Sequence, residues 1–181
     1  MKSTLIAAVL ALTAASASAQ LPAPLKSDVG ARVGAMYPWL DTVYKDLHAN
    51  PEIAFQEVRT AAKLALEMRK LGFEVTEKVG KTGIVAVLKN GAGPTVLVRT
   101  EMDGLPMEEK TGLPYASRAK ATSNGVESFV THSCGHDVHM AGWLGTARTL
   151  AEMKAKWKGT LVFIAHPSEE IVSGARAMLD D

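Results

Sequence analysis

Residues 159–165, Gly159-Thr160-Leu161-Val162-Phe163-Ile164-Ala165, form a nearly continuous apolar run, and His166-Pro167-Ser168-Glu169-Glu170 follows it at once. A short apolar run that ends at a proline is typical of a strand buried within a sheet. The preceding segment, residues 137–155, carries apolar side chains at helical spacing. A helix that leads into a buried strand predicts an α/β fold.

Two more helices and three more strands are predicted upstream. They cover residues 36–49 and 57–71 as helices and residues 73–79, 83–88 and 95–99 as strands. Gly72 stands where the second of these helices should end, because glycine favours the left-handed conformation found there. Turn residues at Gly80-Lys81-Thr82 and at 90–94 suggest hairpins between successive strands.

The segment at residues 100–130 shows no sustained period, which indicates mostly loop with a turn at Asn124-Gly125. A last helix is expected to begin near Gly174. Helices that alternate with buried strands predict a mixed β-sheet sandwiched by helices.

The composition excludes several classes of protein. The chain has 181 residues, 47% of them hydrophobic, with 20 basic and 19 acidic side chains, which is typical of a globular protein. A formal net charge of +1 provides no basic surface for nucleic acid or for an anionic membrane. Cys134 is the only cysteine, so no intramolecular disulfide can form.

The N-terminus resembles an export signal. Lys2 precedes an apolar stretch at residues 5–15, and Ala17-Ser18-Ala19 matches the small-x-small pattern before a cleavage site. The apolar stretch is shorter than the roughly 20 residues that span a bilayer. We therefore predict a signal peptide at 1–19, a proline-containing linker at 20–35, and a periplasmic or secreted protein that has no membrane segment after cleavage.

The cysteine lies in the segment Thr131-His132-Ser133-Cys134-Gly135-His136-Asp137-Val138-His139, at the start of the predicted helix. Two interpretations compete. Cys134 could be a nucleophile with a neighbouring histidine as base and Asp137 to orient it. Alternatively, Cys134 and His136 could bind a metal ion from a loop, and a thiolate is a normal zinc ligand. An unpaired thiol in an exported protein is easier to explain as a metal ligand.

Acidic residues follow two of the predicted strands. Glu169 and Glu170 come after the buried strand, and Glu101 and Asp103 come after the strand at 95–99. Open α/β sheets bind their ligands at the carboxyl ends of strands. One glutamate of the pair could bind a metal ion while the other takes a proton from a metal-bound water.

Four motifs together resemble the dinuclear metal amidohydrolases. They are His48-Ala49-Asn50-Pro51-Glu52, Glu101-Met102-Asp103-Gly104-Leu105-Pro106, Ser133-Cys134-Gly135-His136-Asp137-Val138-His139, and Pro167-Ser168-Glu169-Glu170 with Ser173-Gly174-Ala175. The resemblance is to aminoacylase- and carboxypeptidase-like enzymes that include hippurate hydrolases and hydrolases of indole-acetyl amino acids. It spans residues 36–181 and implies a zinc-exopeptidase-like catalytic domain.

The resemblance also implies roles for individual residues. Cys134, His136 and Glu170 would bind metal. Glu169 would be the general base and acid, and Asp103 the acid that supports the site from the end of its strand. The cofactors would be two divalent ions, zinc or manganese, with cobalt or nickel as alternatives.

Some features depart from the family pattern. Members of this branch usually carry aspartate at the position of Glu101 and commonly glutamine at that of His166, so the roles of these two residues stay open. Relatives are roughly twice as long, with an inserted smaller domain and two further histidine ligands. Three ligands cannot satisfy two ions that each take about four donors. We therefore expect residues 36–181 to be the N-terminal part of a catalytic domain that is inactive alone.

The implied function is hydrolysis of the amide bond of N-acyl or N-aroyl amino acids or small peptides by a metal-bound water. The implied partner is thus a small molecule, and a homodimer could form through the domain absent from this chain. The alternatives are a non-catalytic metal- or ligand-binding protein on the same scaffold and, third, a cysteine hydrolase.

Overall fold

The computed structural model describes residues 21–181. The predicted signal peptide at 1–19 lies outside these residues. Among the helices of residues 21–181, none is both long and apolar enough to cross a membrane.

Helices and strands alternate along the described chain, as the sequence predicts. The elements are α1 (Ala23–Ala49), α2 (Val58–Lys70), β1 (Glu74–Val79), β2 (Gly83–Asn90), β3 (Thr95–Glu101), β4 (Lys120–Ser123), β5 (Val126–Phe129), α3 (His136–Glu152), a 3-10 turn (Lys154–Lys156), β6 (Gly159–His166) and α4 (Gly174–Leu179). Gly72 follows α2 with φ of +84°, as expected of a residue that ends a helix.

The apolar run at the end of the chain lies inside the main sheet. The strand order is β1-β2-β6-β3, and β6 is antiparallel to β2 and parallel to β3. Leu161, Phe163 and Ala165 are buried in the core. The Phe163 ring contacts Phe73 and Trp143 edge-on, with centroids 5.4 Å apart in both pairs. The sheet is therefore mixed, with its most apolar strand covered by neighbours on both edges.

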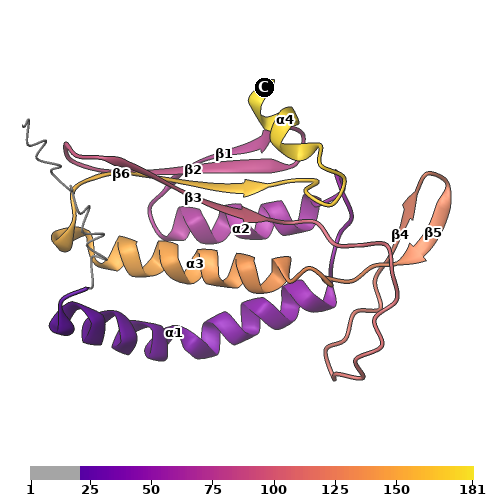
Figure 1. Cartoon of the computed structure of the whole chain (residues 1–181), viewed down its shortest axis with the longest axis horizontal. Helices are drawn as coiled ribbons and strands as arrows, with labels where there is room; N and C mark the ends of the chain where they lie inside the picture. The colour runs from indigo at the N-terminus through magenta and orange to yellow at the C-terminus, as the bar shows by residue number, and fades with distance from the viewer. Residues whose placement is uncertain (1–20) are drawn as a thin grey trace, which may run out of the picture.

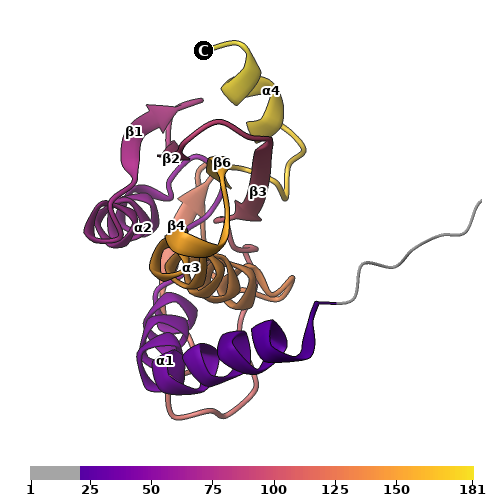
Figure 2. The same ribbon diagram turned by 90° about the vertical axis from the view of Figure 1, so that its left-hand side faces the viewer.

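The layers confirm the predicted fold class. In Figures 1 and 2, α2 and α3 lie on one face of the sheet, α1 packs on the far side of α3, and α4 lies across the opposite face. The mixed sheet is thus flanked by helices on both faces.

One predicted hairpin is correct and the other is wrong. β1 and β2 pair directly through Gly80-Lys81-Thr82, but β6 separates β2 from β3. The glycine-rich segment after β2 instead passes close to the start of β6. A Cβ on Gly93 would lie 2.7 Å from the Lys158 oxygen, and one on Gly159 would lie 2.2 Å from the Pro94 oxygen. These glycines therefore permit two backbone segments to pass close to each other. In the sequence, glycines used in this way look the same as glycines that form a turn.

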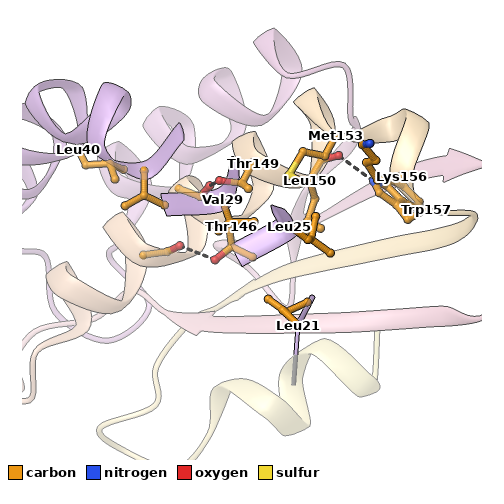
Figure 3. A pocket seen from close by; sticks show the side chains of 13 residues that line it. Leu21, Leu25, Val29, Leu40, Thr146, Thr149, Leu150, Met153, Lys156 and Trp157 are labelled. Atoms are coloured by element: carbon orange, nitrogen blue, oxygen red, sulfur yellow. Dashed lines mark hydrogen bonds between the residues drawn. The ribbon is translucent and has the colours of Figure 1, made fainter. Parts of the chain in front are cut away.

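The predicted linker at 20–35 is also wrong, because α1 already begins at Ala23. Proline is tolerated in the first turn of a helix, so Pro24 starts the helix instead of preventing it. Leu25, Val29 and Val33 recur every four residues on one side of this extension. They line an apolar groove of about 460 Å³ against the second half of α3 (Figure 3), at the end of α3 opposite to His136.

The segment at 100–130, predicted to be mostly loop, contains the hairpin of β4 and β5. The predicted turn at Asn124-Gly125 joins them, with φ of +51° and +78°. Both strands are four residues long, and their residues are exposed or half-buried. Such strands lack the apolar alternation by which a half-buried strand is recognised in a sequence.

Candidate metal site

The three chemically notable segments of the sequence meet at one end of the sheet. The parallel strands β3 and β6 end side by side, with Glu101 opposite His166. The N-terminus of α3, at His136, lies at the same end of the molecule (Figure 1). The acids after β3 and β6 therefore lie at the same end of the fold as the segment that begins α3.

His136, Glu169 and Glu170 form one of two possible donor groups among the described residues. One ligand atom from each lies within 4.8 Å of the other two, and Nε2 of His136 is 3.7 Å from Oε2 of Glu169. His136 is buried, and its Nδ1 donates a hydrogen bond to the backbone oxygen of Asp103 at 2.8 Å. Because Nδ1 carries the proton, the free electron pair of Nε2 faces the carboxylates and can bind a metal ion.

Cys134 lies in the turn before α3, beside Glu170. The hydrogen bond to the Glu170 carboxylate, together with partial loss of hydration, raises the pKa of the Cys134 thiol to about 11. A thiol with this pKa is a poor nucleophile near neutral pH, which weighs against the cysteine-hydrolase interpretation. A divalent cation beside the sulfur would have the opposite effect, because it stabilises the thiolate.

The carboxylate of Glu170 shows whether these residues fit a metal ion. Its Oε1 is buried and has no hydrogen-bond partner within the described chain. An unpaired buried carboxylate oxygen is costly unless a ligand or ion satisfies it. Cys134, predicted as a ligand, lies beside Glu170 but belongs to neither group of donors that lie within 4.8 Å of one another in the described chain. Imidazole and carboxylate groups that converge, with a thiol nearby, are donors that zinc and similar ions prefer. The donor chemistry and the unpaired oxygen therefore both fit a bound divalent cation.

Residues 168–170 form a turn after β6, which we call the glutamate turn. Asp103 contacts the backbone of this turn. Its carboxylate is fully buried, and its two oxygens accept the backbone N–H groups of Glu169 and Glu170, each at 3.0 Å. Oδ1 also lies 3.7 Å from Nδ1 of His136. Asp103 thus lies behind the donor group, where it can orient it.

A second possible donor group, Glu101, His136 and His139, shares His136 with the first. Only Nε2 of His136 is free, and one imidazole nitrogen binds one ion, so the two groups exclude each other. Glu101 pairs instead with Arg99 at 2.5 Å and with Nδ1 of His139 at 3.1 Å. His166 is buried and belongs to neither group. The structure therefore brings Glu101 and His166 close to the site without joining them to the first group.

Two residues outside the predicted set also contribute to this region. Glu57, which precedes α2, is fully buried and accepts the backbone N–H of Ser168 at 2.7 Å. Glu109 faces His48 across the loop after β3. Neither Glu57 nor Glu109 could be recognised as a site residue from the sequence. An acidic residue before a helix is common, and an acidic residue in a polar loop is even more common.

His48, from the first resemblance motif, connects α1 to this end of the molecule. Its Nδ1 is 2.6 Å from Asp137 and its Nε2 is 3.1 Å from Glu109. Burial lowers the pKa of His48, but the hydrogen bonds and charges of the two carboxylates outweigh burial, so the net shift is upward from 6.5. The rings of Tyr44 and Tyr115 also pack against this ring, with centroids at 5.6 and 5.3 Å, and His132 lines the same pocket.

This arrangement predicts a pH-dependent contribution of His48 to stability. Because its pKa is raised in the folded state, the contribution is complete below about pH 6.5 and is lost as the pH rises through the folded-state pKa. We expect His48→Gln to lower the free energy of unfolding more at pH 5.5 than at pH 8.5, as measured by urea denaturation. Equal destabilisation at the two pH values would contradict the charged pairing.

Comparison with known proteins agrees with this geometry. A family model described as Peptidase family M20/M25/M40 matches residues 97–181. N-acetylcysteine deacetylase of Bacillus subtilis (strain 168) is 38% identical over 148 residues, which are 81% of this chain and 37% of that protein. Hippurate hydrolase of Campylobacter jejuni is 38% identical over 142 residues, 78% of this chain and 34% of that protein.

A solved structure with the same fold is that of the Bacillus subtilis YXEP protein, described as a dinuclear metal-binding peptidase from the M20 family. It has 37% sequence identity and a TM-score of 0.72, and the match covers 81% of this chain and 39% of that one. The chain thus spans little more than a third of the length of the curated relatives it matches.

Fold and donor group together define a mixed α/β domain with a candidate metal site at one end of its sheet. Residues 97–181 match the peptidase family M20/M25/M40, and with the named relatives this match confirms the resemblance that the sequence motifs indicate.

Proposed function

We propose that the protein is a metal-dependent amidohydrolase that cleaves N-acyl or N-aroyl amino acids or small peptides. The observation that carries this proposal is the convergence of His136, Glu169 and Glu170 at the carboxyl ends of β3 and β6. The names of the relatives support the substrate class, since one is a deacetylase of N-acetylcysteine and another a hydrolase of hippurate.

Cys134, His136 and Glu170 would hold the metal. The solved relative is described as dinuclear, which supports two divalent ions, and the thiol favours zinc, with manganese, cobalt or nickel as alternatives. When bound, the ions would polarise the scissile carbonyl and lower the pKa of the attacking water. Two ions take about eight donors in all, so further ligands have to come from outside this group. We therefore propose that the 181-residue chain by itself is inactive.

Glu169 would move the proton. Its side chain is partly exposed, whereas its backbone N–H is held by the buried Asp103. A glutamate whose backbone is fixed and whose carboxylate reaches solvent can take a proton from water and donate it to the leaving amine. His136, with Nδ1 bound to the Asp103 carbonyl, keeps its orientation during the reaction. Asp103 would therefore position both the base and a ligand.

The remaining parts of the proposal concern the setting of the enzyme. Near-zero net charge is consistent with a small-molecule substrate rather than a nucleic acid. We also propose that the N-terminal segment directs export to the periplasm or to the medium, and that the protein forms a homodimer.

Hydrolysis of a panel of N-acyl amino acids tests the proposal, and the assay uses a form of the protein that also supplies the further metal ligands. We expect release of free amino acid that stops when a chelator is added and returns with Zn²⁺ or Mn²⁺. Metal binding without hydrolysis of any member of the panel would favour a non-catalytic binding protein. Hydrolysis that a chelator does not affect would favour the cysteine-hydrolase alternative.

A further inference from the structure

The turn that carries Glu169 and Glu170 is held through three successive backbone N–H groups. Two of them, those of Glu169 and Glu170, donate to Asp103 at 3.0 Å each. The third, that of Ser168, donates to Oε1 of Glu57 at 2.7 Å. Both acceptor carboxylates are fully buried. Two buried carboxylates from distant parts of the chain thus bind three successive residues, 168–170.

Ser168 is the residue at which the turn changes direction. It has a φ of +51°, in the left-handed region that non-glycine residues adopt at a cost. Its backbone oxygen accepts the N–H groups of Ser173 and Gly174, both at 3.3 Å. With its N–H bound to Glu57 and its oxygen bound to the start of α4, Ser168 is constrained on both sides. A different conformation here would redirect both glutamates that follow.

Glu57 is itself held in place. Thr82, in the turn between β1 and β2, donates its hydroxyl proton to Oε2 of Glu57 at 2.5 Å. Each oxygen of the Glu57 carboxylate therefore has one donor, and the two donors come from different segments. This arrangement connects the N-terminus of α2 and the β1–β2 turn to the glutamate turn after β6.

We propose that Glu57 is a positioning residue of the metal site, which sets the direction of Glu169 and Glu170 through its hydrogen bond to Ser168. The inference rests on the proposed function of Glu170 as a metal ligand. Glu57 contacts neither of the two glutamate side chains in the described contacts, so it acts through the backbone between them. Partners of this kind typically change metal affinity 10- to 100-fold when they are removed.

Co²⁺ titration tests the proposal, because the absorption bands of bound Co²⁺ report both affinity and ligand geometry. We expect Glu57→Leu to weaken Co²⁺ binding about 10- to 100-fold and to alter the bands at saturation. Glu57→Gln should retain most of the affinity, because its amide oxygen can still accept the Ser168 N–H. A purely structural role would lower the unfolding midpoint but leave the bands of the saturated, folded protein unchanged.

Glu52→Gln is the matched control. Glu52 lies in the same segment and accepts two backbone N–H groups, those of Arg59 at 3.0 Å and Thr60 at 2.7 Å, but none from the glutamate turn. It should leave the Co²⁺ affinity and bands as in the wild type. If Glu57→Leu does not fold, Thr82→Val removes the donor that orients Glu57 and should shift affinity and bands in the same direction.

The outcomes separate the two proposals. If wild-type protein binds no Co²⁺ with a band that depends on Cys134, the proposed metal site fails. If the wild type shows that band and Glu57→Leu, or Thr82→Val in its place, gives the same affinity and spectrum, the positioning role of Glu57 is overturned.

Discussion

Glu169→Gln is expected to remove nearly all turnover while the metal content stays the same. Glutamine has the size of glutamate but cannot accept a proton from water, so only the proton transfer is lost. General acid–base catalysis contributes about 10²- to 10⁴-fold, which sets the expected loss of kcat. The backbone N–H of residue 169 would still donate to Asp103, so the turn should keep its shape.

The measurement combines kcat on the best N-acyl amino acid with elemental analysis of the same preparation. Glu170→Gln is the matched control, because it changes the neighbouring residue of the same turn. It should lower the metal content first and the activity as a consequence. Turnover of Glu169→Gln close to that of the wild type would refute the assignment of this residue as the base.

Replacement of Cys134 by serine together with His136 by alanine should abolish metal binding at this site. The double variant removes the thiol and the imidazole nitrogen that face Glu170 and Glu169. The remaining carboxylates are too few to hold an ion of this type, which takes about four donors. We therefore expect loss of bound metal and, with it, of all activity that a chelator abolishes.

His139→Ala separates the two donor groups that contain His136. His139 is more than half exposed and pairs with Glu101, outside the first group. Its removal should leave the metal stoichiometry unchanged. An unchanged stoichiometry in the Cys134→Ser, His136→Ala double variant, or loss of metal in His139→Ala, would defeat the assignment of the site.

Much of the fold was predictable because its signals are local. Apolar spacing identified α2 and α3, and the run at residues 159–165 identified the central strand β6. The errors arose where the same residue type serves two purposes. Pro24 can end a chain segment or begin a helix, and Gly93 can form a turn or permit a close crossing of backbones. Only the packing partners distinguish these uses.

The site was predictable to the same extent. Cys134, His136, Asp103, Glu169 and Glu170 were all candidates from their motifs. The structure brings His136, Glu169 and Glu170 within reach of one another and binds Asp103 to the backbone of both glutamates. Glu57 was missed because its partner, Ser168, is 111 residues away in the sequence. No spacing rule connects two residues at that separation, and an acid at the start of a helix has an ordinary explanation.

The amino-acid sequence alone was enough to show which donor groups the chain offers and that they follow strands or begin a helix, since both depend on neighbouring residues. Tertiary structure was needed to show that Nδ1 of His136 is bound to the Asp103 backbone, which leaves Nε2 for a single ion. It was also needed to show that Asp103 and Glu57 hold the glutamate turn from two sides. These features depend on hydrogen bonds between segments that meet only when the sheet has formed, because a buried N–H group takes whichever acceptor the packing brings to it.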